Sequence, residues 1–327
     1  MTSIPLWTAV AAATAAGVAV LRGLLQWGIR ANLAAPRVPN GSTPAELGLG
    51  FESVRIDTAN QRRLHGWLIG PATGAVAPYP AAIVMHGWGG NAAMMLPLAQ
   101  SLHEAGFAAL FIDARCHGSS DDDDFASLPR FAEDLEHALG WLATRAEIDA
   151  ARIALIGHSV GAGAALLAAS RRPGVSAVVS VAAFSHPAAM MRRWLASKRI
   201  PQRPFGHHIL EYVQRTIGHR FDDIAPVSTV ARVRCPVLLV HGADDDVVPL
   251  EEAHQIFAAR AHEGVELLVL AGEHDSFADL EQHMGRLVDF LRTAMPPPTE
   301  NSFLEDQASP APRFFRLAVR IGDQGRC

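Results

Sequence analysis

Ser159 is the residue whose surroundings most clearly predict chemistry. It stands in the run GHSVG at residues 157–161, between an apolar stretch and a segment of small residues. A strand, a tight turn and a helix would project the hydroxyl from a strained backbone, and a glycine two positions away on each side leaves room for that turn. The pattern therefore predicts a nucleophile. The alternative, a glycine-rich phosphate turn, lacks a GxGxxG motif and a Walker lysine here.

The chain also offers the two partners that a nucleophilic serine needs. A base must take the hydroxyl proton, and an acid must orient that base. His274 follows one apolar run in the segment AGEHD, and three adjacent aspartates, Asp244, Asp245 and Asp246, follow another. The order serine, aspartate, histidine is a known order of a catalytic triad. The sequence therefore predicts His274 as the base and one of the three aspartates as the acid.

A third segment predicts a site for negative charge. The run HGWGG at residues 86–90 follows an apolar strand, and its glycines expose backbone N–H groups. A tetrahedral intermediate needs two such donors, and the natural pair is the amide of Trp88 with that of Val160, the residue after the serine. The alternative is a plain connecting loop.

These segments would be positioned by alternating strands and helices. Short β-branched runs alternate with longer amphipathic ones, which is typical of a mostly parallel sheet covered by helices on both faces. The predicted strands are 81–85, 108–112, 152–156, 177–181, 237–240 and 266–270, and an antiparallel edge hairpin is predicted at 52–58 and 64–69. The predicted helices are 92–105, 130–145, 160–170, 250–262 and 280–293. No strand pattern occurs at 185–230, so this interval is predicted to form a cap inserted over the sheet. Ligands of such sheets bind where the parallel strands end.

Composition limits the possible functions. The chain has 327 residues, 28 Lys plus Arg and 33 Asp plus Glu, so its net charge of −5 argues against a nucleic-acid partner. With 49% apolar residues, disorder over most of the length is excluded, and residues 40–295 can form one large domain. The three cysteines are too few and scattered for a disulfide framework, and Ser-Lys or Schiff-base chemistry would depend on the only lysine, Lys198.

The two ends of the chain differ from this domain. Residues 4–21 carry no ionisable side chain, and Trp7 and Trp27 would lie about 30 Å apart along a helix, so residues 1–35 predict a membrane anchor. Arg22, Arg30 and Arg37 follow it, which places the catalytic domain in the cytoplasm at a bacterial inner membrane. The alternatives are export after signal-peptide cleavage and a soluble alanine-rich helix. Residues 296–327 predict a Pro-rich disordered tail.

Two other groups of residues could bind ligands. His207, His208 and His219 lie in the predicted cap, but no carboxylate or cysteine falls at metal-ligand spacing, so no metal is expected. The acidic run at 121–124 follows the strand 108–112, where it could receive a cationic group of a substrate, although such runs are usually solvated loops.

Residues 50–293 resemble the α/β-hydrolase superfamily, and in particular bacterial serine hydrolases similar to dienelactone hydrolases and serine-aminopeptidase-like esterases. The segments that carry the resemblance are HGWGG at 86–90, DARCHGSS at 113–120, GHSVG at 157–161, HGADDDVVP at 241–249 and GEHD at 272–275. The family form HGxxDxxVP selects Asp245 as the acid, and Ser159 and His274 match the nucleophile and the base. Cys116 stands where the family usually has glycine.

The resemblance implies acyl transfer to water without a cofactor. The expected function is hydrolysis of a carboxylic ester through an acyl-enzyme on Ser159, with a small-molecule acyl substrate. Met190, Met191 and Trp194 in the predicted cap favour an apolar substrate, although such residues more often pack in a core. The alternatives are a peptidase that removes N-terminal residues and an inactive membrane-tethered scaffold. No pattern indicates an oligomeric state.

Overall fold

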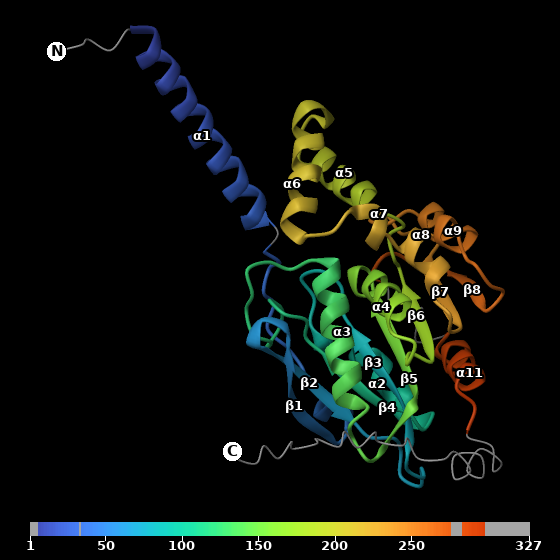
Figure 1. Cartoon of the computed structure of the whole chain (residues 1–327). Helices are drawn as coiled ribbons and strands as arrows, with labels where there is room; N and C mark the ends of the chain where they lie inside the picture. Colours follow the sequence, from blue (N-terminus) through green and yellow to red (C-terminus); the bar gives the residue numbers. More distant parts are fainter. Residues whose placement is uncertain (1–5, 33, 276–282, 298–327) are drawn as a thin grey trace, which may run out of the picture. The chain divides into compact units, whose positions relative to one another are not determined.

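Eight strands of the described chain form one sheet, in the order β1-β2-β4-β3-β5-β6-β7-β8 (Figure 1). The computed structural model describes residues 6–32, 34–275 and 283–297. The strands are β1 (Phe51–Thr58), β2 (Arg62–Ile69), β3 (Tyr79–Met85), β4 (Ala108–Ile112), β5 (Ile148–His158), β6 (Ala177–Val181), β7 (Val237–Gly242) and β8 (Val265–Leu270). Strand β2 pairs antiparallel with β1 and β4, and all other neighbours are parallel. The predicted mostly parallel sheet is therefore confirmed.

Helices cover both faces of this sheet. The α-helices are α1 (Leu6–Asn32), α2 (Ala99–Glu104), α3 (Leu128–Leu142), α4 (Val160–Arg171), α5 (Pro187–Ser197), α6 (His207–Ile217), α7 (Phe221–Ile224), α8 (Pro226–Thr229), α9 (Leu250–Ala258) and α11 (Met284–Ala294). Short helices of other types are η1 (Pro44–Leu47), η2 (Ala59–Gln61), η3 (Ala92–Leu98), η4 (Gln202–Gly206) and η5 (Val230–Arg232). The flanking helices predicted from the sequence are thus present.

Strand β3 shows why its sequence is continuously apolar. Ala81, Ile83 and Met85 belong to the core beneath α3 and α4, whereas Ala82 and Val84 belong to the core beneath η3, α2 and α11. A parallel strand that is buried on both faces cannot alternate apolar with polar residues.

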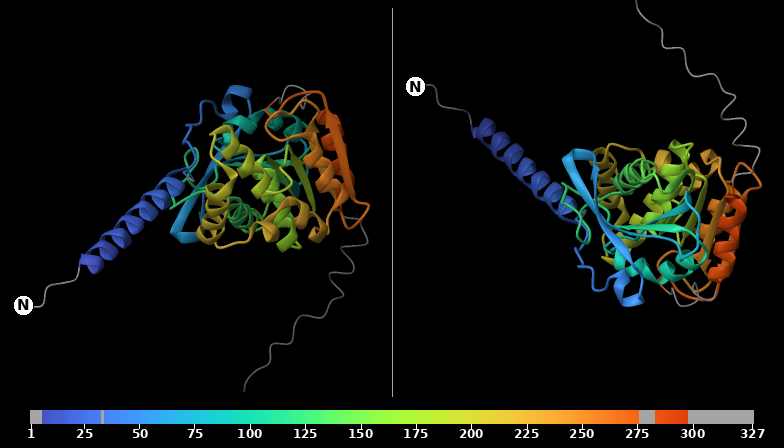
Figure 2. Two further views of the ribbon diagram at one scale, coloured as in Figure 1. Left: turned by 90° about the horizontal axis from the view of Figure 1, so that it is seen from above. Right: turned by 90° about the horizontal axis from the view of Figure 1, so that it is seen from below.

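The interval at 185–230 forms helices α5 to α8. In Figure 1, α5 and α6 lie above the strands, and the view from above in Figure 2 shows the same two helices over the sheet. Arg193 of α5 makes an ion pair with Glu252 of α9, which also accepts a 2.7 Å hydrogen bond from the amide of Ser185. The buried Glu252 carboxylate therefore joins the cap to helix α9.

The N-terminal helix α1 corrects one prediction. Among the residues that the structure describes, no helix combines the length and the apolar character needed to cross a membrane. The predicted membrane helix at 1–35 is therefore not supported. Its weakness is composition, because alanine dominates residues 9–19 and carries little apolar surface, and Arg22 interrupts the run. The location of the catalytic domain stays a prediction.

The chain divides after Met295 into two units. The predicted disordered tail falls almost wholly on residues 298–327, which lie outside the described residues. The end of the predicted helix at 280–293 is described as α11, whereas residues 276–282 are not described.

Candidate active site

Ser159 lies in the turn between β5 and α4, as its sequence pattern predicts. Its backbone has φ 54° and ψ −115°, a strained conformation for a residue with a side chain. The turn is held by a 2.8 Å hydrogen bond from the Ser159 amide to the carbonyl of Val181. A Cβ atom at Gly157 would overlap the backbone of Gly161, and one at Gly161 would overlap the carbonyl of His86. Both glycines are therefore required for close backbone packing.

The structure brings His274 and Asp245 to this serine from the ends of β8 and β7. His274 Nε2 lies 3.0 Å from Ser159 Oγ, and His274 Nδ1 lies 2.8 Å from Asp245 Oδ2. The other carboxylate oxygen of Asp245 accepts hydrogen bonds from the amides of Val247 and Val248, at 3.0 and 2.7 Å. With Nδ1–H donating to the buried carboxylate, Nε2 is left to accept the serine proton.

The three adjacent aspartates differ in burial. Asp245 is buried, whereas Asp244 and Asp246 are exposed. Asp245 accepts two hydrogen bonds from backbone amides, and these hold its carboxylate in one orientation. Its other oxygen therefore faces the imidazole of His274. The position that the resemblance selects is therefore the one that this geometry occupies.

The loop at residues 86–91, here called the oxyanion loop, lies against the serine. A Cβ atom built on Gly87 would be 3.2 Å from Ser159 Cβ. The amide of Val160 is at the first position of α4, where helix donors have no partner within the helix. Among the described residues, neither this amide nor that of Trp88 donates a hydrogen bond. Both donors remain candidates for binding an oxyanion.

Two buried histidines shape the oxyanion loop. His86 Nδ1–H donates to the Gly87 carbonyl at 2.7 Å, while its Nε2 accepts from the Ala114 amide at 3.1 Å. Burial lowers the pKa of His86 to about 4, so the ring is neutral and serves as both donor and acceptor. His117 Nε2 accepts from the Gly89 amide at 3.1 Å, and burial also lowers its pKa. Both rings lie in segments that carry the family resemblance, at 86–90 and 113–120, but no local pattern predicted these contacts.

His158, the neighbour of the nucleophile, contacts the segment after β8 that carries His274. Its Nε2–H donates to the carbonyl of His274 at 2.9 Å, and the two rings lie 5.0 Å apart. Burial lowers the pKa of His158 to about 4. A neutral ring next to Ser159 therefore holds the backbone that carries the base.

His158, His274 and Asp275 offer ligand atoms within 4.8 Å of one another, which makes them a possible metal cluster. Both ring nitrogens of His274 are already within hydrogen-bond distance of Ser159 and Asp245. A metal ion would have to displace one of these contacts and remove the base from the serine. The donors therefore fit the hydrogen-bonded triad better than a resident metal.

The acidic run at 121–124 is largely engaged within the protein. The Asp123 carboxylate lies 3.1 Å from Arg115 and 3.2 Å from Arg130, and Asp122 pairs with Arg37. Asp121 accepts a 2.8 Å hydrogen bond from the Arg63 amide. Asp122 and Asp123 are therefore already paired with arginines of this protein.

Cys116 adopts the left-handed conformation that the family's glycine suits, with φ 67°. Its sulfur donates to the Asp123 carbonyl at 3.4 Å and accepts from the Asp123 amide at 3.2 Å. These contacts hold the residue in a conformation that costs about 1–3 kcal/mol. Burial raises the pKa of this thiol.

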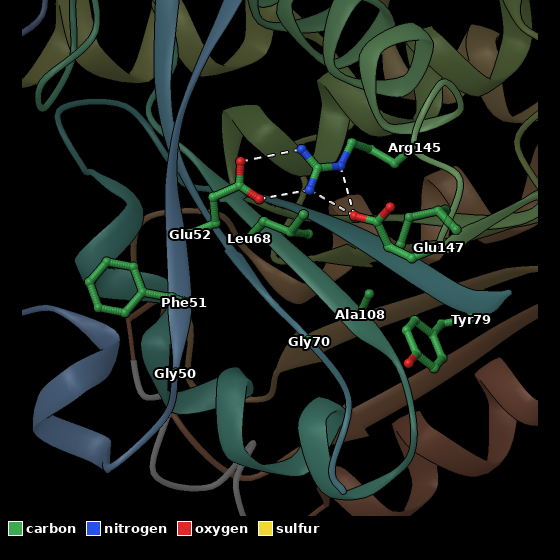
Figure 3. Close-up of a pocket in the computed structure, with 10 residues that line it drawn as sticks. Gly50, Phe51, Glu52, Leu68, Gly70, Tyr79, Ala108, Arg145 and Glu147 are labelled. Carbon is green, nitrogen blue, oxygen red and sulfur yellow. Dashed lines mark hydrogen bonds and ion pairs between the residues drawn. The ribbon is translucent and has the colours of Figure 1, made fainter. Parts of the chain in front are cut away.

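A surface pocket lies at the other end of the strands from Ser159. It is lined by residues at the start of β1, β3, β4 and β5, and Figure 3 shows Arg145 held between two carboxylates. Arg145 is 2.7 Å from Glu52 and 2.7 Å from Glu147. This pocket contains no member of the triad, and the Arg145 guanidinium in it is already paired. We therefore assign these residues a structural role.

Comparison with known proteins agrees with this fold. A family model described as serine aminopeptidase S33 matches residues 77–220. Among solved structures, an esterase of Pyrococcus furiosus is similar with a TM-score of 0.65 and 22% identity, covering 80% of this chain and 97% of that one. An esterase domain of a Rhodothermus marinus protein has a TM-score of 0.54 and 25% identity, covering 75% of this chain and 99% of that one. The fold is that of an α/β-hydrolase, and the family model and the structural neighbours support a serine hydrolase of the α/β-hydrolase superfamily.

Two curated relatives, both uncharacterized, match most of the chain. The Escherichia coli protein YfhR is 28% identical over 252 residues, covering 75% of this chain and 82% of the relative. An uncharacterized protein of Mycobacterium tuberculosis is 28% identical over 226 residues, covering 68% of this chain and 71% of the relative. The family model and the structural neighbours together support hydrolase activity.

Proposed function

We propose that this protein is a serine hydrolase that cleaves carboxylic esters through an acyl-enzyme on Ser159. The observation that carries the proposal is the hydrogen-bonded series from Ser159 through His274 to Asp245, at the ends of β5, β8 and β7. Three residues that are far apart in sequence are joined by two hydrogen bonds, and a strained turn presents the hydroxyl. This is the arrangement that activates an alcohol for acyl transfer.

In the first half of the reaction, Ser159 Oγ attacks the ester carbonyl carbon and His274 Nε2 takes its proton. The buried Asp245 carboxylate stabilises the resulting imidazolium. The negative oxygen of the tetrahedral intermediate accepts hydrogen bonds from the amides of Trp88 and Val160, and the α4 N-terminus adds a favourable dipole. The intermediate then expels the alcohol, which takes the proton from His274.

Water completes the cycle. His274 removes a proton from a water molecule while the water oxygen attacks the acyl carbon. His274 then returns this proton to Ser159 Oγ as the carboxylic acid is released. Every proton moves between substrate, water, Ser159 and His274, so the proposed reaction requires no cofactor.

Exposed apolar side chains favour an ester with an apolar part. Trp88 of the oxyanion loop and Val247 beside the acid are each 40% exposed, as is Trp194 of cap helix α5. Trp88 and Val247 lie on loops that carry proposed site residues, and apolar side chains beside such residues are typical of a small-molecule site. Met190 and Met191 pack against the core, so they contribute less to this argument.

A panel of p-nitrophenyl esters with acyl chains of increasing length tests the proposal. We expect hydrolysis that a fluorophosphonate abolishes, together with one covalent label per chain on Ser159. The Ser159→Ala variant should neither hydrolyse the esters nor take up the label. Absence of both activity and labelling in the folded wild-type protein would contradict the proposal and support a non-catalytic role.

A peptidase of the same fold is the second candidate, because the matching family model is described as a serine aminopeptidase. Such an enzyme needs a free carboxylate for the substrate amine. Asp122 and Asp123 are paired with arginines, and Glu211 in the cap pairs with Arg215. Aminoacyl p-nitroanilides tested beside the esters separate the two candidates, and we expect the esters to be the better substrates.

A further inference from the structure

Residues 36–40, here called the strap, join the N-terminal helix to the hydrolase fold and cross the oxyanion loop. A Cβ atom built on Gly89 would lie 3.0 Å from Pro36 Cγ, and Gly89 has φ +72°. Gly89 directly follows Trp88, whose amide is a proposed oxyanion donor. The strap therefore touches the loop next to the atom that must be aimed.

Two asparagine side chains fasten the far end of the loop to the strap. The buried Asn91 donates through Nδ2 to the carbonyls of Val38 and Pro39, both at 3.1 Å. In return, Asn40 Oδ1 accepts from the Ala93 amide at 3.1 Å. The strap thus supplies acceptors that pair the oxyanion loop and the start of η3.

The strap also holds the loop between β4 and α3. Arg37 donates to the carbonyls of Gly118 and Ser120, at 2.7 and 2.9 Å. Asn40 Nδ2 donates to the buried Asp113 carboxylate at 2.8 Å. The same loop carries His117, whose Nε2 accepts from the Gly89 amide. Gly89 is therefore fixed from two sides, by Pro36 directly and through His117.

We propose that the strap is a positioning element for the oxyanion hole, with Arg37 and Asn40 as its positioning residues. Gly87 lies against Ser159 and Gly89 is held by the strap, so the peptide between them directs the Trp88 N–H toward the reacting carbonyl. This inference rests on the proposed function. Under this proposal, the five strap residues at 36–40, which lie outside the catalytic motifs, set the orientation of the Trp88 N–H.

The expected kinetic effect follows from when an oxyanion donor acts. Such a donor stabilises the negative oxygen of the transition state more than the neutral carbonyl of the bound ester, so a misdirected donor lowers kcat and leaves KM nearly unchanged. Losing one donor outright costs about 10²–10³ in kcat. Loosening it should cost less, and we expect about a 10-fold decrease.

The test uses full-length Arg37→Ala, Asn40→Ala and the double variant. We expect kcat per fluorophosphonate-titrated serine to fall about 10-fold for each single variant, with KM within about 2-fold. The Ki of a trifluoromethyl ketone, which forms an oxyanion on the serine, should rise by the same factor as kcat falls. Because only folded active sites are counted, partial unfolding cannot imitate this result.

Arg145→Ala is the matched control. It removes an arginine that pairs with Glu52 and Glu147 at the other end of the strands (Figure 3). We expect it to lower stability without changing kcat or the Ki. If the strap variants likewise keep the wild-type kcat and Ki per titrated serine, the inference is wrong. If Arg37→Ala does not fold, Asn40→Ala alone decides it. A wild-type protein without esterase activity would instead remove the proposed function.

Discussion

At the scale of single residues, burial and hydrogen bonding assign different roles to three adjacent aspartates. We expect Asp245→Asn to reduce kcat about 10⁴-fold, because an amide at this position favours the wrong tautomer of His274. Asp244→Asn and Asp246→Asn change exposed side chains and should stay within a few-fold of wild type. Steady-state ester hydrolysis measures all three variants. Equal losses in the three would show that the acid is wrongly assigned.

His158 precedes the nucleophile and forms a hydrogen bond with the backbone of His274. Replacement by phenylalanine keeps the ring volume but removes the 2.9 Å hydrogen bond to the His274 carbonyl. We expect kcat to fall about 10- to 100-fold, since small displacements of a reacting group are costly. His158→Gln keeps an N–H donor and should recover most of that loss. Similar kcat values for the phenylalanine variant and wild type would exclude this role.

The candidate site could be predicted only in part from the sequence. Ser159 and His274 follow strands whose apolar runs are visible, so parallel pairing alone places both at one edge of the sheet. Asp245 was chosen from three neighbours by resemblance, since its burial depends on contacts that the local sequence does not show. His86 and His117 were missed because their role depends on partners that are distant along the chain.

At the scale of elements, strands were easier to predict than helices. Strands β4 and β6 have the predicted bounds because they are short, apolar and buried on both faces. The predicted helix at 92–105 divides into η3 and α2, since Pro97 has no N–H to donate and favours a break. The cap was placed only as an interval without strands, and its helices depend on tertiary contacts such as the Arg193–Glu252 ion pair.

Two glycines inside different elements should respond oppositely to alanine. Gly140 is exposed in α3 and has open space around its Cα, so Gly140→Ala should raise the free energy of unfolding by about 0.5–1 kcal/mol. Gly157→Ala forces a methyl group into the Gly161 backbone and should abolish activity. Urea unfolding and ester hydrolysis measure the two effects. A stable, active Gly157→Ala variant would mean that the turn can relax.

At the scale of the whole molecule, buried histidines make stability depend on pH. The folded pKa of His86 is about 4, below the ordinary value of 6.5, so the unfolded chain binds more protons between these values. Stability is therefore lost as the pH falls from 6.5 to 4, by roughly 3 kcal/mol for this residue. Asp134 opposes this trend, because burial raises its pKa to about 6, while His158 adds to it.

We expect the free energy of unfolding to decrease on acidification from pH 6.5 to 4 and the decrease to be smaller in His86→Gln. Glutamine provides one donor and one acceptor but takes up no proton. The exposed His137→Gln variant is the control and should keep the wild-type slope. Urea titrations at several pH values measure each slope. An unchanged slope in His86→Gln would show that this imidazole is not the source.

The proposed base follows β8, which is the last strand among the described residues and lies at an edge of the sheet. During synthesis, the ribosome releases the strap, the oxyanion loop and the serine long before residue 274. A nascent or interrupted chain that ends before β8 therefore carries a nucleophile without the group that deprotonates it. We expect such fragments to lack hydrolase activity however much of the earlier fold they form, and activity to begin only after β8 has docked.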